Sequence, residues 1–260
     1  MDSDQAMKAF EKLSKSIKIL PKKLLPEDVH SLRTHMRRVE AIVQALIPGE
    51  NRDKNLLLKT LKPIRKKAGK VRDMDVLIAF AATLSKKDEE CLVRLIEYLG
   101  AKRLRSANKL RDIPAEKQEE IRHRLRRCSS LIKKHSSGQK ENNELAADAT
   151  TSASSLWIDL SEWSTLKETN LHPFRLKVKE LRYILQLRKE DHKEIVSDLG
   201  KVKDAIGEWH DWNELQRIAA NVLQHGDQCA LLREIDIKTK AKLKNALAVS
   251  NTLRKKYQPG

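Results

Sequence analysis

One stretch of the chain, residues 171–183, carries basic side chains at the spacing of a helix. Because an α-helix advances by about 100° per residue, one face of this stretch would carry basic groups and no carboxylate. These residues are His172, Arg175, Lys179 and Arg182. Like charges at this spacing destabilise a helix by about 0.3 kcal/mol per pair, so the row indicates that an anion binds there. Arginine and lysine recognise phosphate oxygens, and histidine adds a hydrogen-bond donor or a charge.

A similar basic face is predicted nearer the N-terminus, in the sequence HSLRTHMRR that begins at residue 30. Its basic residues are His30, Arg33, Arg37 and Arg38. His30 and His172 are 142 positions apart (172 − 30), and the basic residues that follow them have matching spacings. A single charged stripe is usually a solvated helix face, but its recurrence favours a binding function. The two leading histidines either bind the anion or support a neighbouring helix.

A second pair of similar segments follows the two basic faces in the same order. GKVRDMDVL occupies residues 69–77 and GEWHDWNEL occupies residues 207–215, an offset of 138 positions (207 − 69). Further basic residues on the helices that contain these segments extend the predicted anion site: Lys59, Lys62, Arg65, Lys66, Arg72, Lys203 and His210. We expect Asp73 and Asp211 to hold neighbouring basic side chains in place rather than to bind a metal ion. The repeated order predicts an internal duplication.

Composition and periodicity predict an all-α protein. The 260 residues include only 8 Gly and 7 Pro, and apolar residues recur at steps of three and four. Helices are predicted over residues 4–20, 26–46, 54–84, 87–111, 114–134 and 156–167, from residue 172, and over residues 195–223 and 227–256. Pro63 is expected to interrupt or kink the third helix. On the fourth helix, Leu99 and Leu104 are among the leucines predicted to face the core.

The chain is predicted to form a single domain over residues 1–260 that contains two helical repeats. The repeats extend over about residues 10–134 and 156–257. The stretch between them, residues 135–155, is small and polar, which is typical of a linker. Two four-helix bundles related by pseudo-twofold symmetry would bring the two basic faces toward each other. We therefore expect a basic central groove or pore.

The net charge of +17 limits the range of partners. It favours nucleic acid, an anionic membrane surface or a phosphate polymer. The cysteines, at positions 91, 128 and 229, have neither disulfide-framework nor zinc-site spacing, so we expect no metal and no cofactor. No stretch approaches the ~18 apolar residues of a membrane span, and the N-terminus has no apolar signal region. We therefore expect an intracellular monomer that is neither secreted nor membrane-bound, in the cytoplasm or the nucleus.

The two duplicated signatures resemble those of the CHAD family, the conserved histidine α-helical domain. The resemblance extends over about residues 10–257. It implies non-catalytic binding of inorganic polyphosphate in a basic cavity between two helical bundles, and an association with polyphosphate granules. It places the ligands at His30, Arg33, Arg37, Arg38, His172, Arg175, Lys179, Arg182 and Tyr183. Glu40 and Glu180 depart from the family's pattern, because those positions are commonly basic.

Two other functions fit the same basic surface. A general RNA- or DNA-binding protein would use the same cations, and it could stack bases on Trp209 or Trp212, which we instead expect in the core. An enzyme acting on phosphate anhydrides would need a cluster of metal-binding carboxylates. The acidic run at residues 88–90 is better explained as the first turn of a helix. The sequence shows no phosphate-binding loop and no hydrolase motif, so it favours a polyphosphate-binding protein that is not an enzyme.

Overall fold

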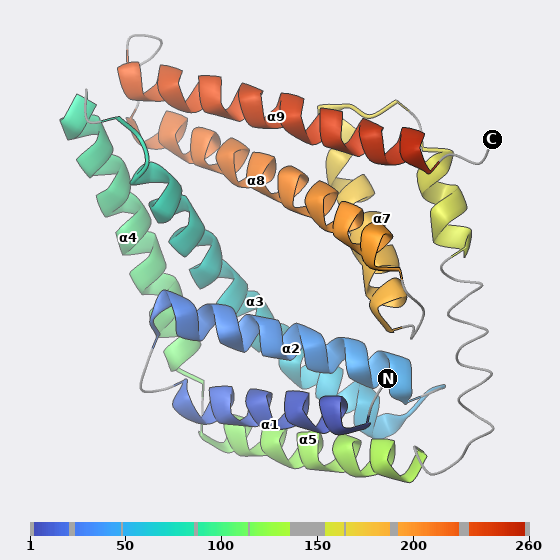
Figure 1. Cartoon of the computed structure of the whole chain (residues 1–260). Helices are drawn as coiled ribbons and strands as arrows, with labels where there is room; N and C mark the ends of the chain where they lie inside the picture. Colours follow the sequence, from blue (N-terminus) through green and yellow to red (C-terminus); the bar gives the residue numbers. More distant parts are fainter. Residues whose placement is uncertain are drawn as a thin grey trace. The chain divides into compact units, whose positions relative to one another are not determined.

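The computed structural model describes residues 3–20, 24–47, 49–85, 88–113, 115–135, 154–163, 165–187, 192–223 and 229–257. Within these ranges the regular elements are helices and no strand occurs, so the all-α prediction is confirmed. The helices are α1 (Ser3–Ile19), α2 (Pro26–Leu46), α3 (Arg52–Ala81), α4 (Glu89–Arg111), α5 (Ala115–His135), α7 (Glu168–Leu187), α8 (Lys193–Leu223) and α9 (Ala230–Lys256) (Figure 1). Residues 154–161 form a further short helix. None of the described helices has both the length and the apolar character that crossing a membrane requires.

The chain clusters into two compact units, each of which is discontinuous in sequence. Unit 1 comprises Met1–Ile78 and Tyr98–Asn143, and unit 2 comprises Ala79–Glu97 and Glu144–Gly260. The segment Ala79–Glu97, which lies within the first predicted repeat, therefore clusters with the second half of the chain. As a result, α3 ends in unit 2 and α4 begins there, although both helices lie mainly in unit 1.

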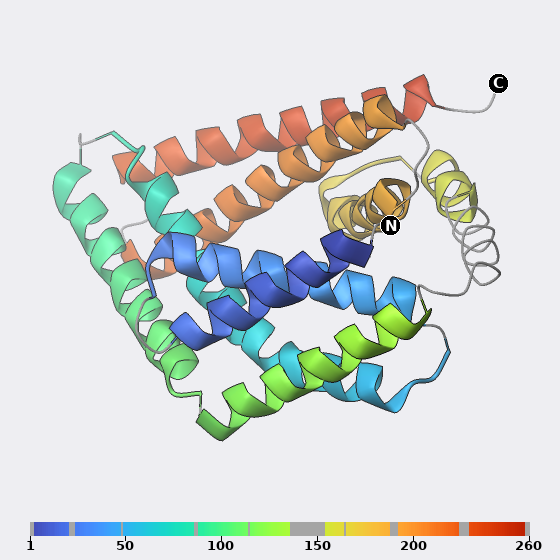
Figure 2. The ribbon, with the colours of Figure 1, turned by 60° about the horizontal axis from the view of Figure 1, so that its bottom comes forward.

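The core of unit 1 is built from the apolar faces of its helices. Helix α1 lies against both α2 and α5, as Figures 1 and 2 show. Phe10, Leu13 and Ile17 of α1 are buried against the same core as Leu32 and Met36 of α2. These residues follow one another at steps of three and four along each helix, which is the spacing of an amphipathic helix. Their burial confirms the periodicity on which the helix predictions were based.

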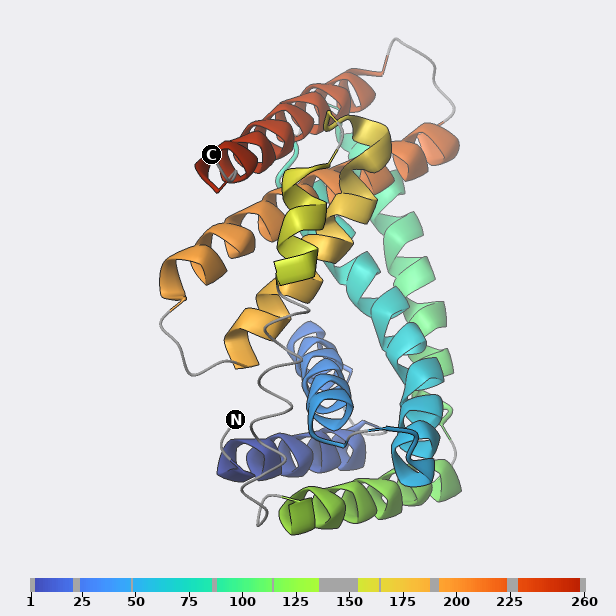
Figure 3. The same ribbon diagram turned by 90° about the vertical axis from the view of Figure 1, so that its right-hand side faces the viewer.

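Unit 2 is arranged around α8. This helix runs antiparallel to α9 and also packs against α7 (Figures 1 and 3). Phe174, Val178 and Leu181 of α7 are buried in the same core as Val202 and Trp209 of α8. The packing that buries this apolar face of α7 leaves the predicted basic row on the other side of the helix.

Residues near the starts of α2 and α3 explain why these helices begin where they do. Helix α2 begins with Pro26 and has acidic residues in its first turn, where both are favourable. The side-chain oxygen of Asn51 accepts hydrogen bonds from the backbone N–H groups of Asp53 and Lys54, so Asn51 caps α3. Between α2 and α3, Gly49 has a φ of 63°, a left-handed conformation that glycine adopts without steric cost.

Three details of the predicted helices differ from the structure. Helix α3 continues from Arg52 to Ala81 through Pro63, so of the two predicted effects of this proline, an interruption or a kink, the interruption does not occur. Proline removes one backbone donor, but Leu61 and Ile64 on either side of it remain buried in the core. Helix α7 begins at Glu168 rather than at residue 172, and the helix predicted at 156–167 extends over residues 154–161. Of the predicted linker, residues 136–153 lie outside the described residues.

The inner face of α4 contains a charge that the apolar pattern did not predict. Leu99 is buried, but Leu104 is 58% exposed, so its predicted inward orientation is wrong. Leu104 is five positions after Leu99, so it is turned by about 140° from it around the helix axis. Arg103 is four positions after Leu99 and lies on the same face. Arg103 takes that inward position, with its Nε 2.5 Å from Oδ1 of the buried Asp75. Its Nη2 also donates a hydrogen bond of 2.8 Å to the carbonyl of Leu24.

Candidate functional site

The predicted anion-binding residues of unit 1 lie on α2 and α3. Those with exposed side chains are His30, Arg38, Lys59, Lys62 and Lys66. Those with half-buried side chains are Arg33, Arg37, Arg65 and Arg72. All of them therefore retain some access to solvent, which an anion site requires.

Two arginines of α2 lie close to other groups of unit 1. The Nε of Arg33 is 3.9 Å from the position that a Cβ on Gly69 would occupy, so the arginine lies beside the glycine of α3. The Nε of Arg37 is buried and has no hydrogen-bond partner among the described residues. A buried donor that lacks a partner costs about 1–3 kcal/mol. A ligand oxygen that reached this nitrogen would therefore be bound favourably.

Glu40 neutralises one of the predicted ligands of unit 1. Its Oε1 accepts a hydrogen bond of 3.0 Å from the Nε of Arg65. Burial raises the pKa of Glu40, and the guanidinium of Arg65 opposes this rise. The carboxylate of Glu40 already engages Arg65. Arg65 is therefore a weaker candidate for direct phosphate contact than the exposed Lys62 and Lys66 on the same helix.

Two histidines from different helices come together in unit 2. The ring centroids of His172 on α7 and His210 on α8 are 5.7 Å apart, and both side chains are exposed. Partial desolvation lowers the pKa of His172, and His210, Arg175 and Lys179 lower it further through their charges. Each of these three groups is basic, so they make the electrostatic potential at His172 more positive. These four residues, His172, Arg175, Lys179 and His210, are called the unit 2 basic cluster below.

Arg175 is fixed against the backbone of α8. Its Nε donates a hydrogen bond of 3.0 Å to the carbonyl of Lys203. A Cβ added to Gly207 would lie 2.7 Å from its Nη2, so glycine is the residue that leaves room for the guanidinium. Arg33 and Gly69 are the corresponding signature residues of unit 1, and they also lie beside each other. The same two positions of the duplicated signatures therefore meet in each unit.

An open cavity of about 900 Å³ lies along α8 in unit 2. Its charged lining residues are Arg182, Lys193, Lys201, Asp204 and Glu208. The Nε of Arg182 donates a hydrogen bond of 3.3 Å to the carbonyl of Val196, which holds this predicted ligand at the cavity wall. Lys193 and Lys201 were not among the predicted ligands, because neither belongs to a repeated signature. Since two carboxylates offset part of the positive charge, this cavity is a weaker anion site than the unit 2 basic cluster.

The other predicted residues of unit 2 differ in how they are paired. The Nζ of Lys203 lies 2.7 Å from Oδ1 of Asp204, so a neighbouring carboxylate partly neutralises it. The side chain of Tyr183 lies outside the described residues. Asp211 is half-buried, and Asp73 of unit 1 is exposed. That these two aspartates hold basic side chains in place stays a prediction.

Both tryptophans of the second signature are buried. Trp209 and Trp212 are each 4% exposed, which confirms that they belong to the core. The ring of Trp212 stacks on Phe80, with ring centroids 4.8 Å apart. Neither indole ring therefore offers a free face on which a nucleobase could stack.

Comparison with known protein families identifies the family of the chain. A family model described as the CHAD domain matches residues 5–220. The matched range contains both basic faces and both copies of the second signature. No curated protein and no solved structure matches the chain.

Proposed function

The chain belongs to the CHAD family, and from this premise we propose that it binds inorganic polyphosphate through the basic faces of its two units without catalysing a reaction. Polyphosphate carries about one negative charge per phosphate and has no sequence to read. A protein that binds it needs closely spaced cations and no acid–base pair. The proposed site comprises basic residues of the two repeated signatures and exposed lysines of α3.

The unit 2 basic cluster is the observation that carries this proposal. It draws basic side chains from two helices to one exposed place, and the charges that lower the pKa of His172 are all basic. Arg175 is already held by the carbonyl of Lys203 and by contact with Gly207. A cation fixed in this way loses little conformational freedom when it binds an anion.

The exposed lysines of α3 support the same function in unit 1. Lys59, Lys62 and Lys66 follow one another at steps of three and four, so they share one face of the helix. All three are exposed. At about 1.5 Å of rise per residue, the row is about 10 Å long, which suits a linear polyanion better than a single phosphate group.

Nucleic acid is the alternative ligand, and a competition experiment separates the two. Polyphosphate and single-stranded RNA of equal length would be titrated against the full chain over a salt series. We expect polyphosphate to bind more tightly, with a logarithm of affinity that falls linearly with the logarithm of salt concentration. The burial of Trp209 and Trp212 removes the stacking surface that would favour RNA. Equal competition by RNA or DNA would contradict the proposal.

The non-catalytic part of the proposal has its own test. The protein would be incubated with Mg²⁺ and long-chain polyphosphate, and free phosphate and chain length would be followed over time. We expect phosphate to stay at the level of a protein-free sample. Release above this background would show that the chain is an enzyme, without changing the binding result.

A further inference from the structure

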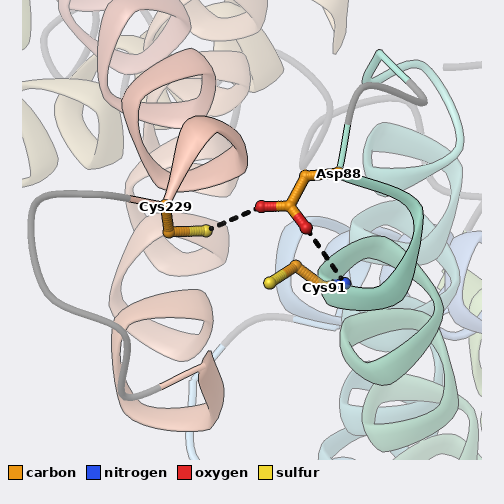
Figure 4. A group of neighbouring side chains, drawn as sticks. All are labelled: Asp88, Cys91 and Cys229. Carbon is orange, nitrogen blue, oxygen red and sulfur yellow. Dashed lines mark hydrogen bonds between the residues drawn. The ribbon is translucent and has the colours of Figure 1, made fainter.

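Three potential metal ligands meet near the starts of α4 and α9. They are Asp88, Cys91 and Cys229 (Figure 4). Asp88 directly precedes α4, Cys91 lies in the first turn of that helix, and Cys229 directly precedes α9. All three belong to unit 2, and none belongs to the proposed polyphosphate site. Their arrangement is therefore a feature of a single compact unit.

The three residues are already linked through the carboxylate of Asp88. The Sγ of Cys229 donates a hydrogen bond of 3.4 Å to Oδ2 of Asp88, and Oδ1 of Asp88 accepts one of 3.4 Å from the backbone N–H of Cys91. One ligand atom from each residue lies within 4.8 Å of the other two. Cys91 and Cys229 are 7% and 4% exposed. Figure 4 shows the two sulfur atoms pointing toward each other from the two helix starts, with the carboxylate beside them.

The distance between Cys229 and Asp88 is close to one edge of a tetrahedral metal site, and the other ligand atoms lie within 4.8 Å. With Zn–S distances of about 2.3 Å and a Zn–O distance of about 2.1 Å, the S···O edge is about 3.6 Å and the S···S edge about 3.8 Å. The sulfur–oxygen distance of 3.4 Å is close to this edge. We propose that Asp88, Cys91 and Cys229 bind a thiophilic divalent cation of the Zn²⁺ class, with water or another donor in the fourth position.

The ligand set favours a metal ion over simpler explanations. A disulfide between the cysteines would make no use of the carboxylate, and a helix cap at Asp88 would make no use of the thiols. A divalent cation engages all three groups: its binding releases the thiol protons of Cys91 and Cys229 to solvent, and it compensates the negative charges of the two thiolates and the carboxylate. Two sulfur ligands favour Zn²⁺ and related ions, whereas Mg²⁺ and Ca²⁺ prefer oxygen ligands alone.

The two cysteines have the sequence offset of the repeated signatures. They are 138 positions apart (229 − 91), the same offset that relates Gly69 to Gly207. The two cysteines therefore correspond to each other under the internal repeat. A metal ion at this place would join Ala79–Glu97 to α9, two segments of unit 2 that are distant in the chain.

Titration with Co²⁺ tests the proposal, because thiolate ligands give a sulfur-to-cobalt charge-transfer band. The reduced full chain, free of polyphosphate, would be compared with the variants C91S, C229S and D88N. C128S is the matched control, since Cys128 is also buried but belongs to unit 1. We expect one tetrahedral Co²⁺ per chain in the wild type and in C128S, which Zn²⁺ displaces. The two-thiolate band should be lost in C91S and C229S, and D88N should bind Co²⁺ about tenfold more weakly or worse.

If a serine variant fails to fold, the intensity of the charge-transfer band in the wild type still tests the proposal. This intensity counts the thiolates that ligate Co²⁺, and two are expected. A wild-type band that indicates fewer than two thiolates, or a band of two-thiolate intensity in folded C91S or C229S, would overturn the proposal, whereas a one-thiolate band in a variant agrees with it. Co²⁺ bound at the His172–His210 pair would give no sulfur band, so a H172Q/H210Q variant should keep the full signal.

Discussion

The guanidinium group of Arg175 occupies the space that a side chain at position 207 would need. A Cβ added to Gly207 would lie 2.7 Å from Nη2 and 3.3 Å from Cζ of this arginine. In unit 1 the corresponding Cβ on Gly69 would lie 3.9 Å from Nε of Arg33, which is an ordinary contact. The glycine of the second signature therefore lies beside the arginine of the first in each unit, and the approach is much closer in unit 2.

The closer approach at Gly207 than at Gly69 predicts different changes in the free energy of unfolding for two matched glycine-to-alanine substitutions. Alanine in place of a glycine inside a helix stabilises it by about 0.5–1 kcal/mol when space allows, so G69A should raise the free energy of unfolding. G207A should not be stabilised in this way, because the guanidinium of Arg175 must move. This movement weakens its hydrogen bond to the carbonyl of Lys203. G207A should also weaken polyphosphate binding. Urea denaturation and a binding titration measure both effects.

The same pair of variants also provides the control. If G207A gained as much stability as G69A and bound polyphosphate as tightly as the wild type, the contact between Arg175 and residue 207 would have no role in binding.

Polyphosphate binding should strengthen as the pH falls. The pKa of His172 lies below its ordinary value of 6.5 in the free protein, because of burial and its basic neighbours. A bound phosphate would raise this pKa, so binding is coupled to proton uptake. The affinity measured between about pH 8 and about pH 6 should therefore rise toward the acidic end. H172Q should reduce this pH dependence, and an unchanged profile would show that His172 does not face the ligand.

Folding stability should show the opposite trend with pH. Because the pKa of His172 is lower in the folded than in the unfolded chain, the unfolded chain binds more protons. The contribution of His172 to the free energy of unfolding is therefore fully present above pH 6.5. It is lost as the pH falls through the lowered pKa of the folded chain. His35 should contribute in the same direction, since burial, Lys12 and Arg38 also lower its pKa. H172Q and H35Q should therefore each weaken the dependence of the free energy of unfolding on pH, as measured by urea denaturation over a pH series.

The exposed lysines of α3 should contribute to the salt dependence of binding. The variant K62E/K66E removes two cations from the proposed site, so the slope of log affinity against log salt should fall by about two. The variant K8E/K15E makes the same charge change on exposed residues of α1 in the same unit. It should keep the slope and lose only a little affinity through the long-range field. Equal losses in the two variants would mean that net charge alone governs binding.

Removal of the Glu40 carboxylate should strengthen polyphosphate binding. The variant E40Q frees Arg65 from its ion pair while keeping the shape of the side chain. An exposed or half-buried ion pair is worth up to about 1 kcal/mol, so we expect a gain of up to about fivefold in affinity. A titration at constant salt measures this gain. Weaker binding by E40Q would instead show that Glu40 positions Arg65 for the ligand.

The ion pair between Asp75 and Arg103 should be important for the stability of unit 1. The variant R103A leaves the carboxylate of Asp75 buried without this partner, which should lower the free energy of unfolding by about 3 kcal/mol or more. R105A is the control on the same helix, because Arg105 is exposed and should change stability by less than about 0.5 kcal/mol. Similar losses in R103A and R105A, measured by urea denaturation, would contradict this role.

The sequence by itself determined the helical class, the family and most of the core faces, with Leu104 of α4 as an exception. Apolar residues at steps of three and four report directly on helix faces, and Phe174, Val178 and Leu181 are buried as that spacing requires. The burial of Trp209 was predictable from its alignment with Val71 in the repeated signature, and both residues are buried. The spacing of the repeated signatures was sufficient to identify the family, since it needs no knowledge of how the helices pack.

Tertiary structure alone decided which charged groups act together. The approach of His172 to His210, the pairing of Glu40 with Arg65, and the inward position of Arg103 depend on the rotation of one helix against another. Cys91 and Cys229 had no metal-site spacing in the sequence, yet folding brings them to the same carboxylate. Periodicity determines which face of a helix is buried, but only the packing of helices determines which side chains on two such faces meet.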